Sequence, residues 1–408
     1  DFSERGFGFS SVEDVWQEDV RYVPFNKGGA YRKWYGNNNL VIKFDKKSYQ
    51  ELAKSGNRLP SRKYYFRKGT TWSSATASSF SGRYCETGFV FAGKGPMCFA
   101  NDERDILSIL AFLNSKLTSF FMDIFSSATD FNQGTMRNLP YIPLKGEIKQ
   151  KIGLLVSDCI DISKNDWDES EISWDFERHP FIKNVSSNNK SNLSLKISDI
   201  YTQWETKKNQ ILDRLKINEE TINRILIDLY NLQEELTPEV EEKDMSLQIP
   251  HLQRDIKSFM SYFMGCVFGR YNFHRVKVIP TGKELVFSKD SLFHIDRDNV
   301  IPITDDNYFS EDIITLFDEF LVACYGKETL EENLDFIAQA LGKKEESSRG
   351  TIRNYFVVDF YKDHLKTYQK KPIYWLYDSG KQNGFKALVY MHRYDEDTTG
   401  RVRVDYLH

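Results

Sequence analysis

The chain has 408 residues, of which 40% are hydrophobic and 28% are charged, an ordinary globular mixture long enough for two or three domains. Its formal net charge is −4 and its pI is about 6.1, which excludes a uniformly basic coat and confines any nucleic-acid contact to a patch. The five cysteines are scattered without CxxC spacing, so we expect a reducing cytoplasm and no zinc site. No apolar run approaches the length of a membrane span and no signal peptide is visible, so no membrane contact is expected.

Residues 1–147 read as a mixed, β-rich domain. Short apolar runs at 40–44 and 89–91 are bounded by glycines and predict strands. Apolar residues between 106 and 124 recur at three- and four-residue steps, which predicts one helix capped by Asn101 or Asp102. A polar loop at 131–140 then leads into a predicted strand at 141–144.

The segment 24–36, Pro-Phe-Asn-Lys-Gly-Gly-Ala-Tyr-Arg-Lys-Trp-Tyr-Gly, places cations, aromatic faces and bare glycine backbone side by side, and three asparagines follow it. From 27 to 68 the chain carries twelve lysines and arginines against two acids, a local balance of +10. Such an asymmetry within an acidic chain marks a candidate nucleic-acid face. The alternative is a solvated loop with ordinary lysines.

A protein that reads DNA needs phosphate contacts for position and base-edge contacts for sequence choice. The phosphate candidates are the basic residues Lys27, Arg32, Lys33, Lys63, Arg67 and Lys68. Gly28 and Gly29 would let backbone amides approach a strand closely.

Base edges call for other side chains, because Asn pairs bidentately with adenine and Arg with guanine. The base-edge candidates are Asn37, Asn38, Arg83 and Arg137, with Asn138 beside the last. Trp34, Tyr35 and Trp72 are stacking candidates. Core packing is the alternative for each aromatic residue, and a role in a turn is the alternative for each asparagine.

The rest of the chain divides into a helical spacer and a mainly helical end. The spacer, 148–245, contains a Ser/Asn-rich stretch at 186–194 and a long helix predicted from about 197 to 236. Residues 246–408 contain a predicted helix at 251–268, one capped by Ser310, and one that begins at Thr329 and stops at Gly342. Runs at 372–377 and 385–390 predict a terminal β-hairpin, so the predicted fold class is α+β.

No catalytic constellation is visible in the sequence. It has no P-loop, dinucleotide fingerprint or nucleophile elbow, and no carboxylate spacing that indicates an acid–base pair or a metal site. The Pro-Pro-Tyr/Phe element of amino-methyltransferases is also missing, and Asn138-Leu-Pro-Tyr141 is a poor match to it. We therefore predict no catalytic residue, metal ligand or cofactor ligand in this chain.

An ordered series of blocks resembles a known family. The blocks include 24–37, Arg67-Lys-Gly-Thr-Thr-Trp-Ser73, Leu113-Asn-Ser-Lys116, Arg137-Asn-Leu-Pro140 and Gly265-Cys-Val-Phe-Gly-Arg-Tyr271. Together they resemble the C-terminal half of the adenine-specific DNA methyltransferases of BREX phage-defence systems (the PglX family), with fused type II restriction–modification enzymes as wider kin. The sequence begins at Asp1 without a methionine, which leads us to expect a fragment of a longer chain.

The resemblance implies a division of labour. An upstream half would bind S-adenosylmethionine and methylate adenine, while this half, with 1–147 as target-recognition domain, would recognise double-stranded DNA. The implied partners are the upstream methyltransferase domain, DNA and other defence-system proteins, all in the cytoplasm. Two alternatives stay open: the nuclease half of a restriction enzyme, and a protein-interaction scaffold of a defence complex.

Overall fold

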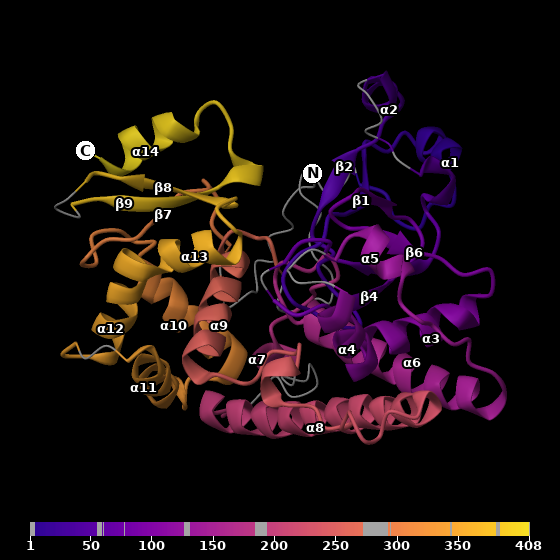
Figure 1. The fold of residues 1–408 in the computed structure, drawn as a ribbon. Coiled ribbons are helices and arrows are strands. Elements are labelled where there is room, and N and C mark those ends of the chain that lie inside the picture. The colour runs from indigo at the N-terminus through magenta and orange to yellow at the C-terminus, as the bar shows by residue number, and fades with distance from the viewer. Residues whose placement is uncertain are drawn as a thin grey trace. The chain divides into compact units, whose positions relative to one another are not determined.

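The computed structural model describes residues 5–54, 59, 61–76, 78–125, 131–183, 194–271, 293, 295–342, 345–380 and 384–407. The chain forms two compact units. The amino-terminal unit consists of residues 4–168 and 209–249, and the carboxy-terminal unit of residues 1–3, 169–208 and 250–408. The predicted boundaries at 147/148 and 245/246 differ from this division, because the predicted spacer is shared between the two units. The predicted α+β class is confirmed, with three small sheets among many helices in the part of the chain that the structure describes (Figure 1).

Two three-stranded sheets lie in the amino-terminal unit. One has the order β2-β1-β5, formed by β1 (Tyr22–Asn26), β2 (Val41–Lys43) and β5 (Val90–Phe91). The other has the order β4-β3-β6, formed by β3 (Gly69–Trp72), β4 (Gly82–Cys85) and β6 (Met97–Cys98). The strands predicted at 40–44 and 89–91 are confirmed as β2 and β5. Only the β1–β5 pair is parallel among these strands as described.

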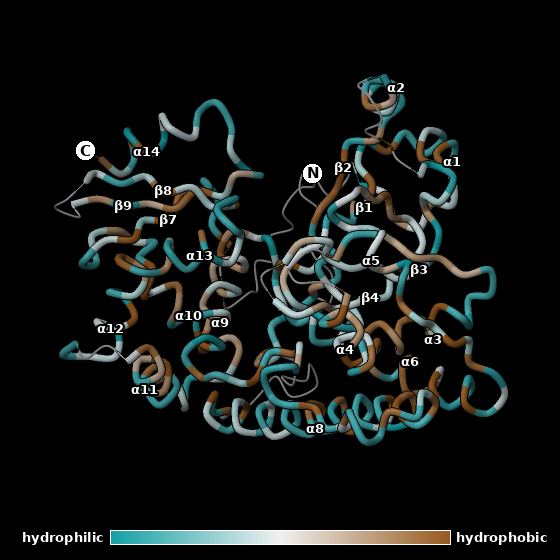
Figure 2. The backbone as a smooth tube through the Cα atoms, viewed as in Figure 1, coloured by the Kyte–Doolittle hydropathy of each residue, from teal (hydrophilic) through white to brown (hydrophobic). Residues whose placement is uncertain are grey.

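Helices make up the remainder of this unit. They are α1 (Val12–Gln17), α2 (Lys46–Lys54), η2 (Arg62–Tyr64), α3 (Glu103–Asn114), α4 (Lys116–Phe125), α5 (Gln133–Arg137), α6 (Gly146–Asp168), η3 (Glu242–Asp244) and the larger part of α8 (Ile197–Tyr230). Figure 2 shows α6 and α8 alternating between brown and teal along their length, the pattern of helices with one buried face.

Two local predictions in this unit are corrected. The single helix predicted across 106–124 is broken at Ser115, where the backbone is extended, and α3 and α4 meet at 63°. The side-chain amide of Asn114 forms two hydrogen bonds with the backbone of Gly82, which fixes the end of α3 against β4. The strand predicted at 141–144 is wrong, because these residues form no regular secondary structure and pair with no described strand; the Ile142 amide donates instead to the Tyr230 hydroxyl at 2.9 Å. The cap predicted at Asp102 is confirmed.

The carboxy-terminal unit is a helical layer with one small sheet. Its elements are α7 (Pro180–Lys183), α9 (Leu252–Val267), α10 (Ile313–Tyr325), α11 (Leu330–Leu341), α12 (Ser348–Tyr355), η4 (Phe356–Phe360), α13 (Tyr361–Thr367), η5 (Met391–Arg393), α14 (Thr398–Tyr406) and the strands β7 (Ile301–Pro302), β8 (Tyr374–Asp378) and β9 (Lys386–Tyr390). The sheet order is β7-β9-β8. A cluster of aromatic rings that includes Phe263, Phe317, Phe320 and Phe356 fills the core between the helices.

The hairpin and the helix ends of this unit agree only in part with the sequence predictions. The hairpin is confirmed as β8 and β9, but α14 follows it, so the hairpin does not end the chain. Asp312, not Ser310, caps α10 by accepting the amides of Ile314 and Thr315. Gly342 ends α11 with a left-handed φ of 75°, as predicted. The long helix α8 ends at Tyr230, six residues before the predicted end at 236.

Among the described residues, no single helix has both the length and the apolarity needed to cross a bilayer, although the bent pair of α3 and α4 has them when taken together.

Candidate nucleic-acid interface

The most basic part of segment 24–36 is built into the interior of the amino-terminal unit. Arg32 donates from its guanidinium to Asp166 at 2.7 Å and to the Ser163 carbonyl at 2.9 Å, both on α6. Its Nε donates to the Tyr35 carbonyl at 2.8 Å. The guanidinium also lies 5.2 Å from the centre of the Trp167 ring. The charge of Arg32 is therefore held by partners inside the protein.

Lys33 is enclosed in the same way by α8. Its Nζ lies 2.8 Å from Glu219 Oε2, and the indole of Trp34 donates to Glu219 Oε1 at 2.6 Å. Burial is the largest single effect and disfavours the charged ammonium, but the charge of Glu219, its hydrogen bond to Lys33 and the charges of Tyr31 and Asp244 together outweigh burial and raise the pKa of Lys33 above its ordinary value. The expectation that Arg32 and Lys33 contact phosphates is corrected, because both are less than a tenth exposed and neutralised internally.

The aromatic candidates are also buried. Tyr35 and Trp72 are 5% and 3% exposed, and the Trp72 indole donates to the Phe131 carbonyl at 2.8 Å. Trp34 is buried as well. The alternative of core packing therefore holds for all three rings, which have no face available for a base in this conformation.

Arg83 is the most deeply placed of the predicted base readers. It is 1% exposed, and its nearest described acceptors are the Arg32 carbonyl and Ser73 Oγ, each at 3.5 Å. No carboxylate within the described part of the chain forms an ion pair with it. Burial lowers the pKa of its guanidinium to about 10. The prediction that Arg83 contacts a base edge is wrong, because its side chain does not reach the surface.

The two glycines and two asparagines shape the turn above Arg83. Gly28 has a φ of +82°, and a Cβ there would lie 2.8 Å from the Lys94 carbonyl. The Gly29 amide is already used, because it donates to Ser73 Oγ at 2.9 Å. Asn37 adopts a φ of +62° and donates to the Ala30 carbonyl at 2.9 Å, the turn role that was its alternative. Asn38 is half-buried.

The remaining candidates are at the surface. Lys63 and Arg67 are exposed and lie over the ring of Tyr64, 5.0 and 5.5 Å from its centre. Lys68 pairs with Glu103 at 3.2 Å. Arg137 and Asn138 are exposed at the end of α5. Lys27 is exposed and forms no ion pair with any described carboxylate.

A surface groove of about 690 Å³ gathers some of these groups. It is lined by Phe25, Lys27, Ser74, Ala92, Gly93, Lys94, Asn132, Gln133 and Gly134, and we call it the Lys27–Gln133 groove. Lys94, like Lys27, is exposed and has no carboxylate partner among the residues that the structure describes. The groove therefore combines two cations that have no described carboxylate partner with side-chain amides and a partly apolar floor.

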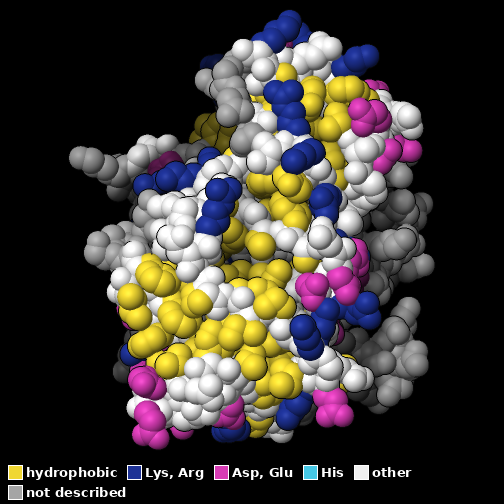
Figure 3. All heavy atoms as spheres, turned by 45° about the vertical axis from the view of Figure 1, so that its right-hand side comes forward, with side chains coloured by type: hydrophobic (Ala, Val, Ile, Leu, Met, Phe, Trp, Pro, Cys, Tyr) yellow, Lys and Arg dark blue, Asp and Glu magenta, His cyan; other side chains and the backbone are white. Residues whose placement is uncertain are grey.

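The sequence predictions missed Lys94, Asn132 and Gln133. For Asn132 and Gln133 the signal was present in the loop 131–140, where Gln133 stands four residues before Arg137, whereas Lys94 carried no such signal. Figure 3 shows separate dark-blue side chains over the upper part of the visible face and a continuous yellow area lower down. Exposed apolar residues of this unit include Ile124, Phe125 and Ile142.

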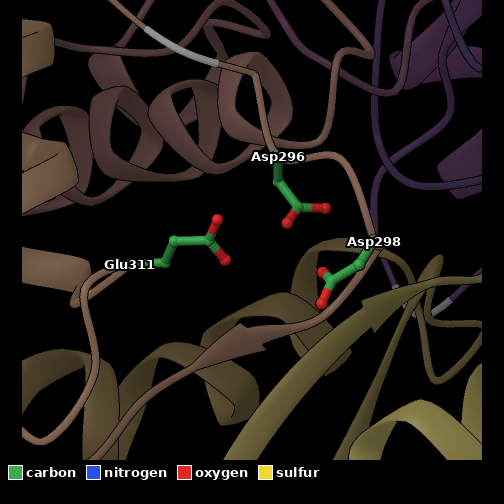
Figure 4. A group of neighbouring side chains, drawn as sticks. All are labelled: Asp296, Asp298 and Glu311. Atoms are coloured by element: carbon green, nitrogen blue, oxygen red, sulfur yellow. The ribbon is translucent and has the colours of Figure 1, made fainter. Parts of the chain in front are cut away.

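An acidic cluster lies in the carboxy-terminal unit. Asp296, Asp298 and Glu311 place carboxylate oxygens within 4.8 Å of one another (Figure 4). Arg393 lies 3.4 Å from Asp296, and the Tyr406 hydroxyl donates to Asp298 at 2.7 Å. Burial, followed by the charge of Asp298, raises the pKa of Asp296 to about 8.

No family model matches the sequence. Two curated proteins match 98% of the chain: the adenine-specific methyltransferase PglX of Lacticaseibacillus casei (strain Zhang), 42% identical over 412 residues, and the adenine-specific methyltransferase BrxX of Escherichia coli O9:H4 (strain HS), 34% identical over 428 residues. The matched region is 34% of each relative, so the chain spans about a third of their length. The chain is homologous to part of these BREX-type adenine-specific methyltransferases, and the resemblance predicted from its sequence blocks is confirmed.

Proposed function

We propose that the amino-terminal unit recognises double-stranded DNA on behalf of an adenine-specific DNA methyltransferase. The observation that carries the proposal is the match of nearly the whole chain to a third of two such enzymes, in a sequence that lacks the amine-clamping element of methyl transfer. In this proposal the chain does not carry out the methyl-transfer step. A groove lined by cations that have no described carboxylate partner supports a role in choosing the target site.

The methyl donor does not fit this part of the chain. Doubly wound folds hold nucleotide-like cofactors at the carboxyl ends of parallel strands. The described sheets are small and almost entirely antiparallel, and no glycine-rich strand-to-helix turn accompanies their single parallel pair. In the proposal S-adenosylmethionine is therefore held by another part of the longer protein, which also receives the adenine once it has left the duplex.

The proposed DNA-contacting surface includes fewer cations than the basic segment 27–68 suggests. Of the predicted phosphate contacts, Lys27, Lys63 and Arg67 are exposed, and exposed Lys94 lines the Lys27–Gln133 groove together with Lys27. Arg83 contributes differently: its buried charge lies behind the Gly29 turn and makes this region more positive through a low-dielectric interior.

The test is a measurement of duplex binding by the full-length methyltransferase that contains this region. Replacing both Lys27 and Lys94 with Ala should weaken binding and flatten its salt dependence, by about 0.9 in the log–log slope for each phosphate that is no longer neutralised. Lys151→Ala, an exposed lysine on α6, is the matched control. If the salt dependence of duplex binding were unchanged in the double variant, the groove would not be part of the DNA-binding surface. Competition with RNA of the same length tests the preference for DNA.

The rivals predict other results. A nuclease half would cleave DNA in the presence of magnesium, with the acidic cluster of Asp296, Asp298 and Glu311 as the candidate metal site. A protein-interaction scaffold would co-purify with defence proteins while showing no affinity for a duplex.

A further inference from the structure

The helix α5 presents two long polar side chains on one face. Gln133 and Arg137 are four residues apart, the spacing that aligns side chains along a helix, and both are exposed. Gln133 also lines the Lys27–Gln133 groove. We infer that α5 is the element that determines sequence specificity, with Gln133 and Arg137 contacting base edges; this rests on the proposed DNA-recognition function.

The helix is short, so its position depends on its attachments. The Phe131 amide donates to the Ser74 carbonyl at 2.8 Å, and the Phe131 carbonyl accepts the Trp72 indole N–H. The Phe131 ring packs edge-on against Phe80, with centroids 5.2 Å apart. These contacts fix the start of α5 to the end of β3, so side chains on α5 have a defined origin.

The side chain of Asn132 caps α5, so we do not assign it a contact with a base edge. Its carboxamide oxygen accepts the amides of Gly134 at 2.8 Å and Thr135 at 3.1 Å, which caps the helix. Gln133 comes next along the chain and reaches outward. Because Gly134 has no side chain, nothing from that position crowds the amide of Gln133.

The chemistry of the two side chains suits two different bases. A glutamine amide donates and accepts at once, which matches N7 and N6 of adenine in the major groove. An arginine fork matches O6 and N7 of guanine. Lys27 and Lys94, which line the same groove as Gln133, would hold the phosphates of the same segment. The arrangement separates phosphate contacts from base contacts, as a sequence-specific site requires.

The experiment uses the full-length methyltransferase and maps the methylated motif of Gln133→Ala, Arg137→Ala and Arg137→Lys. Each alanine variant should relax one position of the motif, with a roughly 5- to 150-fold loss of discrimination there. Arg137→Lys keeps the charge but loses the fork, so it should also relax the motif while binding non-cognate duplex normally. Gln210→Ala and Arg224→Ala, at exposed positions of α8, are matched controls.

The outcomes separate this inference from the proposed function. An unchanged motif in all three α5 variants, in a protein whose duplex affinity still depends on Lys27 and Lys94, would overturn the inference alone. Loss of that lysine dependence would instead overturn the proposed interface. Circular dichroism of each variant shows whether it has kept its fold, and Gln133→Glu gives a second, charge-repelling variant that should exclude the cognate site without unfolding the protein.

Discussion

Lys33 Nζ and Glu219 Oε2 are 2.8 Å apart inside the amino-terminal unit, although 186 residues separate them in the sequence. Both side chains are at most a tenth exposed. Together with Arg32 and Asp166, the pair ties the 31–36 turn to α6 and α8. Arg32 and Lys33 therefore stabilise the packing of this turn against the two helices.

Replacing Lys33 with Ala should destabilise this unit strongly. The change leaves the Glu219 carboxylate buried beside only the Trp34 indole, and breaking a buried ion pair costs about 3–5 kcal/mol. Urea denaturation would measure the loss, with Lys47→Ala on the exposed side of α2 as control. Adding Glu219→Gln should recover part of it, because the amide oxygen still accepts the indole N–H. A variant of full stability with a shallower salt slope for DNA would return Lys33 to the interface.

Much of the fold could be predicted from sequence, because local patterns determine it. The helix at 251–268 and the hairpin at 372–390 follow from periodicity and turn residues. The break at Ser115 could not be predicted, because it depends on a long-range bond between Asn114 and Gly82. The same is true of the irregular segment at 141–144, where the Ile142 amide bonds to the distant Tyr230 hydroxyl and not to a neighbouring strand.

The candidate site was harder to predict because charge in a sequence does not reveal burial. Arg32 and Lys33 look identical to Lys27 in a count of cations, yet their counterions lie on helices more than a hundred residues away. Lys94 was overlooked because it stands alone in a glycine-rich turn, and the groove joins it to Lys27 only in the folded chain.

Arg83 should behave differently from Arg32 when replaced by methionine. Arg83 is buried without a described carboxylate partner, so Arg83→Met removes a desolvated charge and should change the unfolding free energy by less than about 1 kcal/mol. Arg32→Met abandons Asp166 and should cost about 3–5 kcal/mol. Parallel urea titrations of the two variants make the comparison. Equal losses would mean that Arg83 has a stabilising anionic partner in the folded chain.

Gly93 lines the groove and Gly28 follows the lining residue Lys27, but only Gly28 has a left-handed φ. Gly28→Ala places a Cβ 2.8 Å from the Lys94 carbonyl at a φ of +82°, and strain of this kind costs about 1–3 kcal/mol. Gly93→Ala meets nothing within 4 Å and should be neutral. Thermal melting distinguishes the two. If Gly28→Ala melts like Gly93→Ala, the turn adjusts freely and does not hold Lys27 in a fixed place.

The Asp296 cluster should make the carboxy-terminal unit less stable as pH rises. The folded pKa of Asp296 is about 8, against 3.8 as the ordinary value, so between these limits the native state keeps a proton that the unfolded chain has released. The unfolding free energy should fall across that window by up to about 1.4 kcal/mol per pH unit. Asp296→Asn removes this slope, whereas exposed Asp305→Asn should leave it. Identical slopes in both variants would show that Asp296 ionises normally.

His364 should produce the opposite dependence at lower pH. Its Nε2 accepts the amides of Ile373 and Tyr374, and burial, followed by the nearby charge of Arg270, lowers its pKa to about 3 from 6.5. Between these values the unfolded chain binds a proton that the native state refuses, so stability is complete above pH 6.5 and declines as pH falls.

The measurement for His364 is the unfolding free energy by urea at several pH values from about 6.5 down to about 4, where the loss should again approach about 1.4 kcal/mol per pH unit. His364→Gln keeps an acceptor for the two amides but cannot titrate, so its profile should lack this component even if the variant is less stable throughout. His251→Asn removes a histidine from the exposed cap of α9 and preserves a capping side chain, which makes it the matched control. Protonation of His364 Nε2 would break the two hydrogen bonds that the backbone amides of Ile373 and Tyr374 donate to it. Hydrogen exchange at these two amides, corrected for intrinsic rates, should therefore accelerate over the same pH range in the wild-type protein. A wild-type profile that matches His364→Gln would mean that His364 binds protons equally in the folded and unfolded chains, so that folding does not lower its pKa.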